Sequence, residues 1–157
     1  MVTTRVQLTA YVAEWVNRRY GDAWGLVRFP RSSDLYLLLY ELMSKRPYNS
    51  PVDRGNVKIA LPDRREANRS GGKSPEQFNY ITQEATKTLD RRLTMMFWAE
   101  VHDNLDEARH RHGLQYKEAA RLFIRRYRIT GISEEGILKN YQRWRKKVRQ
   151  HRHTSVI

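Results

Sequence analysis

The sequence predicts a mainly α-helical protein of the α+β class, with about five helices and a small N-terminal β element. Three observations lead to this prediction. Apolar residues recur every three or four positions over long stretches of the second half of the chain. Short segments with strict apolar–polar alternation occur only within the first 62 residues. Hydrophobic residues make up 39% of the chain, enough to build a core. We therefore expect a long central helix followed by a pair of helices joined by a short turn.

The 157 residues suit one compact unit with three regions. Residues 1–62 form an N-terminal α/β sub-region. Residues 63–74 are polar, contain two glycines and show no periodicity, so we expect a flexible loop there. Residues 75–157 form a helical region. The loop is therefore the expected boundary between the two larger regions.

The first elements are a strand and a helix. Residues 2–8 alternate between apolar and polar side chains, as a strand with one buried face does. Thr9 is placed to cap a helix over residues 10–20, and Gly21 ends it. Residues 26–29 form a second short apolar piece.

A second helix and another strand follow. Ser32 or Ser33 is placed to cap a helix that extends to about residue 44, before Pro47. This helix is apolar on nearly all sides, so we expect it to be buried at the centre of the N-terminal core. Residues 57–61 alternate again and predict a strand that ends at Pro62.

The long central helix is predicted from the pattern after Pro75. Ser74 and Pro75 suit a helix cap and first turn. Apolar residues then recur every three or four positions. A break or kink near Thr82 stays open, and residues 82–111 fit one continuous helix. Gly113 is its expected C-terminal stop.

The last predicted pair of helices lies between Tyr116 and Arg152. A tight connector over residues 128–133 separates them, where we expect Gly131 to take a left-handed backbone conformation. Ser133 is placed to cap the second helix of the pair. The apolar residues expected to pack inward are Tyr116, Ala120, Phe123, Ile124 and Tyr127 in the first helix, and Ile137, Tyr141, Trp144 and Val148 in the second.

The positive charge is concentrated in this same part of the chain. The formal net charge is +13. Residues 109–153 contain 14 Lys and Arg but 3 acidic residues, a net charge of +11, whereas residues 1–108 carry a net charge of +2. A localised positive surface attracts a polyanion, because each neutralised phosphate releases condensed counterions. The sequence therefore predicts a nucleic-acid-binding surface on the last two helices.

The candidate nucleic-acid-binding residues are the polar and basic side chains that face away from the apolar side of these helices. Arg, Lys, Asn and Gln can read base edges or bind phosphates. The candidates are Lys139, Asn140, Gln142, Arg143, Lys146, Lys147 and Arg149 in the second helix, and Arg121, Arg125, Arg126 and Arg128 in the first helix and connector.

Over about 35 residues this segment resembles helix-turn-helix DNA-binding units in its architecture. The resemblance implies that residues 133–152 dock on duplex DNA. The common bacterial pattern has a small residue four positions before the turn glycine, where this chain has Tyr127. The chain departs from that tight two-helix pattern, and a looser trihelical or winged relative stays open. The strand–helix–helix order of the first 44 residues also resembles ribbon-helix-helix proteins, in which a dimer would present Thr3, Arg5 and Gln7 to DNA. A homodimer is therefore one expected assembly.

Two other functions stay open at this point. An RNA-binding or single-strand-binding protein would use Tyr127, Tyr141 and Trp144 as stacking surfaces, although their positions predict burial. A structural adaptor would use the basic helices to bind an acidic protein partner. Duplex DNA is favoured over RNA, and we expect a regulator or accessory protein of a bacterial mobile element or phage.

The sequence offers no catalytic, metal or cofactor site. It contains no Cys, so thiolate metal sites and disulfides are excluded. Residues 70–74 (SGGKS) resemble the end of a phosphate-binding loop but lack its first glycine, and Glu107 with His110 is a single Glu-x-x-His pair. No apolar run has the length of a membrane span. We therefore expect a non-enzymatic protein with no membrane partner, in the cytoplasm (nucleoid-associated, or in the host cytoplasm if viral).

Overall fold

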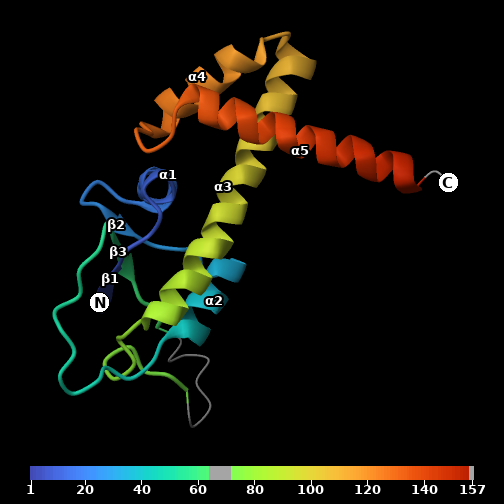
Figure 1. Cartoon of the computed structure of the whole chain (residues 1–157). Coiled ribbons are helices and arrows are strands. Elements are labelled where there is room, and N and C mark those ends of the chain that lie inside the picture. The colour runs from blue at the N-terminus through green and yellow to red at the C-terminus, as the bar shows by residue number, and fades with distance from the viewer. Residues whose placement is uncertain (64–71, 156–157) are drawn as a thin grey trace. The chain divides into compact units, whose positions relative to one another are not determined.

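The computed structural model describes residues 1–63 and 72–155, with side chains described as far as residue 151. In that part of the chain it contains five α-helices and one three-stranded sheet (Figure 1). The prediction of a mainly α protein with a small N-terminal β element is confirmed. The chain divides into two compact units, Met1–Thr94 and Met95–Ile157.

The sheet of the first unit has the strand order β1-β3-β2. Strand β1 (Thr3–Val6) pairs antiparallel with β3 (Val57–Ala60), and β2 (Leu26–Val27) pairs parallel with β3 on its other side. The predicted strands at residues 2–8 and 57–61 are thus confirmed with shorter bounds. Because β1 pairs with a strand of its own chain and β2 interrupts the connection to the next helix, this unit differs from a ribbon-helix-helix protein.

Helix α1 (Ala10–Tyr20) packs on this sheet through one apolar face. Val12, Trp15 and Val16 are almost completely buried, and Gly21 follows the helix as predicted. Thr9 is at the N-cap position, but its hydroxyl does not cap the helix. It donates instead to Asp90 Oδ2 at 2.8 Å, so the predicted capping bond is wrong and the side chain serves a long-range contact.

Helix α2 (Asp34–Leu42) begins at the predicted cap, since Ser33 Oγ accepts from the backbone N–H of Tyr36 at 3.3 Å. Leu35 and Leu39 are buried, whereas Leu37 is 41% exposed. The expectation that the helix is buried on all sides is therefore wrong. One face of α2 enters the core, and the high apolar content leaves leucine on the outer face.

The long central helix α3 spans Gln83–His112, within two residues of the bounds that the sequence predicts. It begins after Thr82, whose hydroxyl accepts from the N–H of Ala85 at 3.0 Å, while residues 75–77 form a separate turn. The expected helical start at Pro75 is thus wrong. The division between the two units falls inside α3, so residues 75–94 belong to the first unit. The expected boundary at 63–74 stays a prediction, because residues 64–71 lie outside the described residues.

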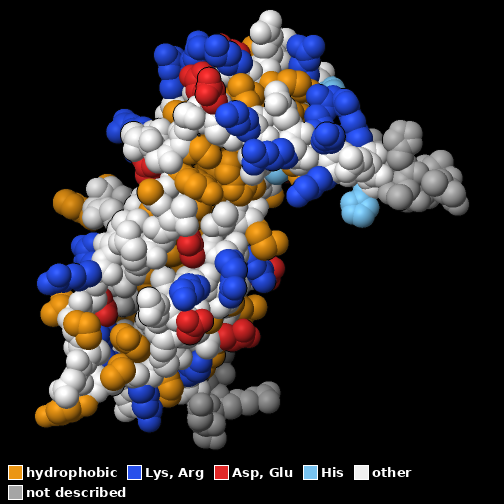
Figure 2. Space-filling model, in the orientation of Figure 1, with side chains coloured by type: hydrophobic (Ala, Val, Ile, Leu, Met, Phe, Trp, Pro, Cys, Tyr) orange, Lys and Arg blue, Asp and Glu red, His pale blue; other side chains and the backbone are white. Residues whose placement is uncertain are grey.

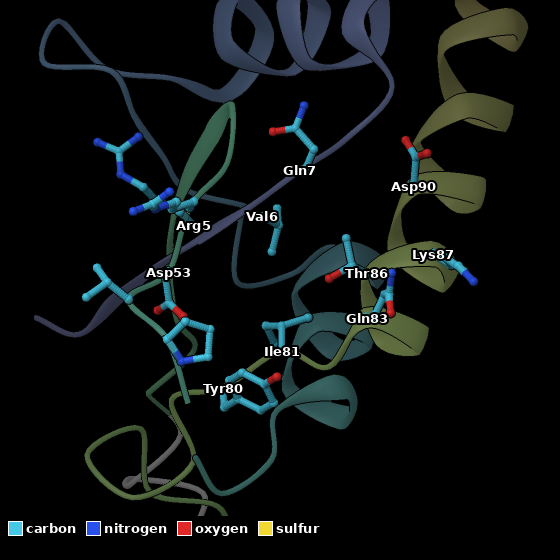
Figure 3. Close-up of a pocket in the computed structure, with 13 residues that line it drawn as sticks. Arg5, Val6, Gln7, Asp53, Tyr80, Ile81, Gln83, Thr86, Lys87 and Asp90 are labelled. Atoms are coloured by element: carbon cyan, nitrogen blue, oxygen red, sulfur yellow. The ribbon is translucent and has the colours of Figure 1, made fainter. Parts of the chain in front are cut away.

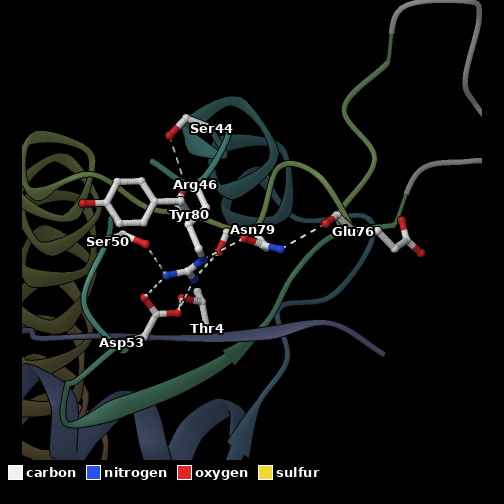
Figure 4. Close-up of polar contacts among 8 residues, drawn as sticks. All are labelled: Thr4, Ser44, Arg46, Ser50, Asp53, Glu76, Asn79 and Tyr80. Atoms are coloured by element: carbon white, nitrogen blue, oxygen red, sulfur yellow. Dashed lines mark hydrogen bonds and ion pairs between the residues drawn. The ribbon is translucent and has the colours of Figure 1, made fainter. Parts of the chain in front are cut away.

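Arg46 joins three segments of the first unit (Figure 4). Its Nη1 and Nη2 donate to the two carboxylate oxygens of Asp53 at 3.0 and 2.6 Å. Its Nε and Nη2 also donate to the side chain and the backbone carbonyl of Asn79, each at 3.1 Å, and Nη1 donates to Ser50 Oγ at 3.2 Å. These bonds use all five N–H groups of the guanidinium. Since Thr4 Oγ1 donates to Asp53 at 2.7 Å, the cluster also includes β1.

The electrostatics of this cluster follow from its contacts. Burial alone would raise the pKa of the Asp53 carboxyl, but the hydrogen bonds from Arg46 and Thr4 outweigh it and lower the pKa below its usual value. The hydrogen bond to Asp53 raises the pKa of Arg46 further. Arg46 also lies over the ring of Tyr80, with its guanidinium carbon 5.5 Å from the ring centroid. These contacts stabilise the ionised forms of both Arg46 and Asp53.

The second unit consists of the later turns of α3 with α4 (Tyr116–Tyr127) and α5 (Glu134–Ser155). Gly113 has a φ of 65° and ends α3, as predicted. At the end of α4 the left-handed residue is Arg128, with a φ of 50°, rather than Gly131. The N–H of Arg128 and that of Ile129 donate back to carbonyls of α4, so the helix ends at Tyr127, four residues before the glycine.

Candidate nucleic-acid interface

The core of the second unit fixes how α4 and α5 present their outer faces. Phe97, Val101 and Leu105 of α3 are completely buried, and Ile137 and Tyr141 of α5 are buried to within 1%. The predicted inward face of α5 is thus confirmed at its first two positions. Burial of these side chains determines which residues of α5 point outward.

Polar contacts join α5 to α3 and set its rotation about its own axis. His102 Nε2 lies 2.8 Å from Asn140 Oδ1, and the Tyr141 hydroxyl donates to the Asp106 carboxylate. Burial, together with this bond to a carboxylate, raises the pKa of Tyr141 above its ordinary value, so the phenol stays a donor at physiological pH. Trp144 stacks on His102 with ring centroids 4.3 Å apart and an interplanar angle of 17°. Trp144 is half-buried rather than buried.

Helix α4 is held in the same unit by two further contacts. The Tyr127 hydroxyl donates to Glu100 Oε1 at 2.7 Å. Arg121 Nε donates to Glu134 at 3.1 Å, and its Nη1 lies 3.5 Å from Glu118. Arg121 therefore bridges α4 to the start of α5, and two carboxylates surround its charge.

The outward face of α5 consists of polar and basic side chains, as the helical spacing predicts. The exposed residues are Lys139, Gln142, Arg143, Lys146, Lys147 and Arg149. Among the described residues, none of the five cations of this group has a carboxylate within ion-pair distance. From Lys139 to Arg149 the face extends about 15 Å along the helix axis. We call these six residues the α5 basic face.

Three further candidate residues lie at the end of α4 and in the connector. Arg125, Arg126 and Arg128 are exposed. The guanidinium of Arg126 lies over the ring of Tyr127 at 5.2 Å, which leaves its outer face accessible. Figure 2 shows Lys and Arg side chains gathered over α4 and α5. These three arginines extend the positive surface of the unit beyond α5.

The structure thus separates the eleven candidate residues into two groups. Nine are exposed and point outward. Arg121 and Asn140 make contacts inside the unit, Arg121 with two glutamates and Asn140 with His102. The sequence alone gives no signal for these contacts, because the partner of Asn140 is 38 residues away in the chain. Arg121 and Asn140 therefore stabilise the unit, and the nine exposed residues form the candidate interface.

The charge along α5 is uneven. Glu134 and Glu135 occupy its first turn, where carboxylates interact favourably with the helix dipole. The basic residues begin at Lys139 and continue through the helix. A polyanion would consequently approach the middle and C-terminal half of α5 rather than its N-terminus.

The other motifs in the sequence have structural roles where the structure describes them. Lys73, in the SGGKS segment, donates to the backbone carbonyls of Tyr40 and Glu41 at 3.3 and 2.6 Å, near the end of α2. Residues 70 and 71 of that segment lie outside the described residues. Glu107 Oε1 lies 3.4 Å from Arg111, and the described residues contain no group of three or more His, Asp or Glu that could hold a metal ion.

The chain was compared with family models, curated proteins and solved structures. None of the three comparisons finds a match. Among the described residues, no helix combines the length and the apolar composition that a membrane span requires.

Proposed function

We propose that this protein is a non-enzymatic nucleic-acid-binding protein that docks the α5 basic face on duplex DNA. The observation that carries the proposal is a row of cations on one helix face, from Lys139 to Arg149, with no carboxylate paired to them among the described residues. B-DNA carries about one negative charge per 1.7 Å of its axis, so a face about 15 Å long meets several phosphates.

The charge of these residues is available to a partner because the fold does not use it. Exposed cations that pair with phosphates release condensed counterions, and this release is favourable at physiological salt. Gln142 and Arg143 occupy the centre of the face and have side chains that can read base edges in a major groove. Arg125, Arg126 and Arg128 would bind phosphates beside the groove.

The aromatic residues favour a duplex over a single strand. Single-strand binding uses exposed aromatic rings on which bases stack. Tyr127 and Tyr141 are 4% and 1% exposed, and Trp144 already stacks on His102. In the described part of α4 and α5, a surface of cations beside these packed or stacked aromatic rings suits the backbone of a double helix. Such a protein would act as a regulator or accessory factor in the cytoplasm or on the nucleoid.

Fluorescence anisotropy with a labelled random-sequence duplex of about 20 base pairs, at two salt concentrations, tests the proposal. The variant replaces Lys139, Arg143 and Lys146 with Ala. We expect its affinity to fall on the order of 10- to 100-fold at about 100 mM salt, with the helical circular dichroism unchanged.

A matched control removes the same charge from the first unit. Arg18, Arg28 and Lys58 are exposed cations of that unit, and their replacement by Ala should change duplex affinity less than about threefold. Equal losses in the two triple variants would mean that binding follows net charge, and the docking surface on α5 would be rejected. A wild-type protein with no duplex affinity at low salt would reject the function itself.

A further inference from the structure

Strand β1 has an unpaired edge. The strand order β1-β3-β2 places it at one side of the sheet. The Leu61 N–H donates to the Val2 carbonyl, and the Leu8 N–H donates to Asn56, so the backbone groups of even-numbered residues face β3. The pairing of β2 agrees with this alternation. Lys58 of β3 lies opposite Arg5, and its backbone N–H and C=O groups point away from β1 toward β2, which pairs with it in parallel. The backbone N–H and C=O groups of Thr3, Arg5 and Gln7 therefore point away from β3.

These outward backbone groups have no partner among the described residues. Outside the β1–β3 ladder, no hydrogen bond to the backbone of Thr3, Arg5 or Gln7 occurs within that part of the chain, and the register of the ladder directs their backbone groups away from β3. Leu8 and Thr9, by contrast, have their N–H groups bound to Asn56 and Asp90. Thr3 and Arg5 of β1, together with Gln7 just after it, thus leave a row of backbone donors and acceptors open, and such an edge is a template for another extended chain.

A groove of about 770 Å³ lies along this part of β1 (Figure 3). It is lined by Arg5 and Val6 of the strand and by Gln7, which follows the strand, together with residues 51–54 and parts of residues 80–90. Consecutive residues of an extended chain point to opposite faces, so a groove lined by all three runs along the edge of this segment. In Figure 3, Val6, Ile81 and Thr86 project toward a common space.

The charges in the groove favour an acidic occupant. Its lining contains three cations, Arg5, Arg54 and Lys87, and two carboxylates. Asp53 already accepts from Arg46 and Thr4, and Asp90 accepts from the backbone N–H and hydroxyl of Thr9 at 3.1 and 2.8 Å.

The cations of the groove make weaker contacts within the protein than its carboxylates do. Arg5 makes a long hydrogen bond of 3.5 Å to the Gly55 carbonyl, and Lys87 lies 3.4 Å from Glu84 in an exposed pair. An exposed ion pair of this kind contributes little and exchanges easily. The cations of the groove can therefore pair with a bound chain, whereas its two carboxylates already accept hydrogen bonds from the protein.

A second copy of this chain fits the groove poorly. A two-fold pairing of β1 with β1 of another copy that uses Thr3, Arg5 and Gln7 of both strands is centred on Arg5. It would place two Arg5 side chains directly opposite each other, and like charges in that position are destabilising. The open strand edge and the excess of cations both favour an extended acidic chain from another protein.

We propose that this groove binds an extended acidic peptide segment of a partner protein, which adds to β1 as a fourth strand of the sheet. The backbone of the peptide bonds to the outward groups of Thr3, Arg5 and Gln7. Its acidic side chains meet Arg5 and Arg54 on one face, and its alternate apolar side chains pack on Val6, Pro51 and Ile81. The site belongs to the first unit and is separate from the α5 basic face.

The test uses a fluorescein-labelled peptide of three Glu-Val repeats with blocked ends. Binding is measured on the full chain carrying the Lys139, Arg143 and Lys146 to Ala changes, so that α5 does not attract the peptide by charge. We expect saturable binding that weakens about tenfold or more in the Arg5→Glu, Arg54→Glu double variant. Duplex binding of an otherwise wild-type chain with these two changes stays within about threefold of its original value.

Two further probes separate strand addition from simple charge attraction. Gln7→Pro removes one outward N–H and no bond to β3, as an edge strand tolerates, and it should weaken the peptide about fivefold. A peptide with the same side chains but N-methyl groups on alternate amides cannot form the ladder and should not bind.

Three results overturn the proposal. The first is equal binding of the N-methylated and unmodified peptides. The second is loss of peptide binding when only the three α5 residues are changed. The third is a homodimer, seen by sedimentation, that Gln7→Pro dissociates. The last result would assign the edge of β1 to a second copy of the chain. Should Gln7→Pro fail to fold, as judged by circular dichroism, the Arg5→Glu, Arg54→Glu variant and the N-methylated peptide still decide the question.

Discussion

Arg46 in the first unit and Arg143 in the second have the same side chain and opposite uses. Every N–H group of Arg46 donates to a protein acceptor, and its guanidinium lies over the ring of Tyr80. Arg143 is exposed, and among the described residues no carboxylate pairs with it. The first arginine stabilises the fold, and the second is available for a partner. A positive charge therefore indicates a binding surface only where the fold leaves its donors free.

The largest expected effect is on stability, and it tests the structural role of Arg46. Replacing Arg46 with Ala removes five hydrogen bonds and leaves Asp53 partly buried without its cation. We expect a loss of about 3 kcal/mol in the free energy of unfolding, because breaking a charge-assisted cluster leaves an uncompensated carboxylate. Urea unfolding followed by circular dichroism measures it.

The matched variant for that experiment is Arg143→Ala. Its free energy of unfolding should stay within about 0.5 kcal/mol of the original protein, as is usual for exposed positions. If the two variants lost equal stability, the distinction between a structural and an available arginine would be wrong.

The pH dependence of the same cluster gives the next largest effect. The pKa of Asp53 is lower in the folded chain than its ordinary value of 3.8. A lowered folded pKa means that the stabilisation is present above about pH 4 and is lost as the pH falls through the folded value. The difference in unfolding free energy between the original protein and Asp53→Asn should therefore be largest near pH 6 and shrink below pH 4.

The control for the pH series is Glu135→Gln, an exposed carboxylate in the first turn of α5. Its difference from the original protein should be small at every pH. A difference for Asp53→Asn that stays constant from pH 6 to pH 3 would contradict the assigned role of its charge.

A smaller effect distinguishes two neighbouring polar residues of α5. Asn140 bonds to His102, whereas Gln142 is exposed. Asn140→Ala should cost about 1 kcal/mol of stability, because the nearly buried His102 loses a hydrogen-bond partner. Its duplex affinity should not change. Gln142→Ala should behave in the opposite way, with unchanged stability and a measurable loss of affinity. If Asn140→Ala bound the duplex more weakly while its free energy of unfolding stayed unchanged, Asn140 would belong to the interface.

Much of the fold follows from local patterns in the sequence. Helix α3 is long and strongly periodic, so its bounds are predicted to within two residues. Gly113 follows it in the left-handed conformation, where a glycine carries no steric penalty. The exposed face of α5 also follows from spacing alone, because the residues at three- and four-residue intervals share one side of a helix.

The errors arise where a distant contact overrides a local preference. Thr9 has the position of a helix cap but bonds to Asp90, which is 81 residues away. Gly131 is the obvious residue for a left-handed backbone, yet α4 ends after Tyr127, which is buried and bonded to Glu100, so Arg128 takes that conformation. The two-residue strand β2 is too short for any pattern, since its place depends on pairing with β3.

The most direct test of the central claim is the dependence of duplex affinity on salt concentration. The slope of log K against log salt counts phosphate contacts, at about 0.9 per contact on B-DNA. If Lys139, Arg143 and Lys146 bind phosphates, their replacement by Ala should reduce the steepness of the slope by about 2 to 3. The Arg18, Arg28 and Lys58 variant should keep the original slope. Identical slopes for the original protein and the α5 variant would contradict the claim that this face binds the duplex.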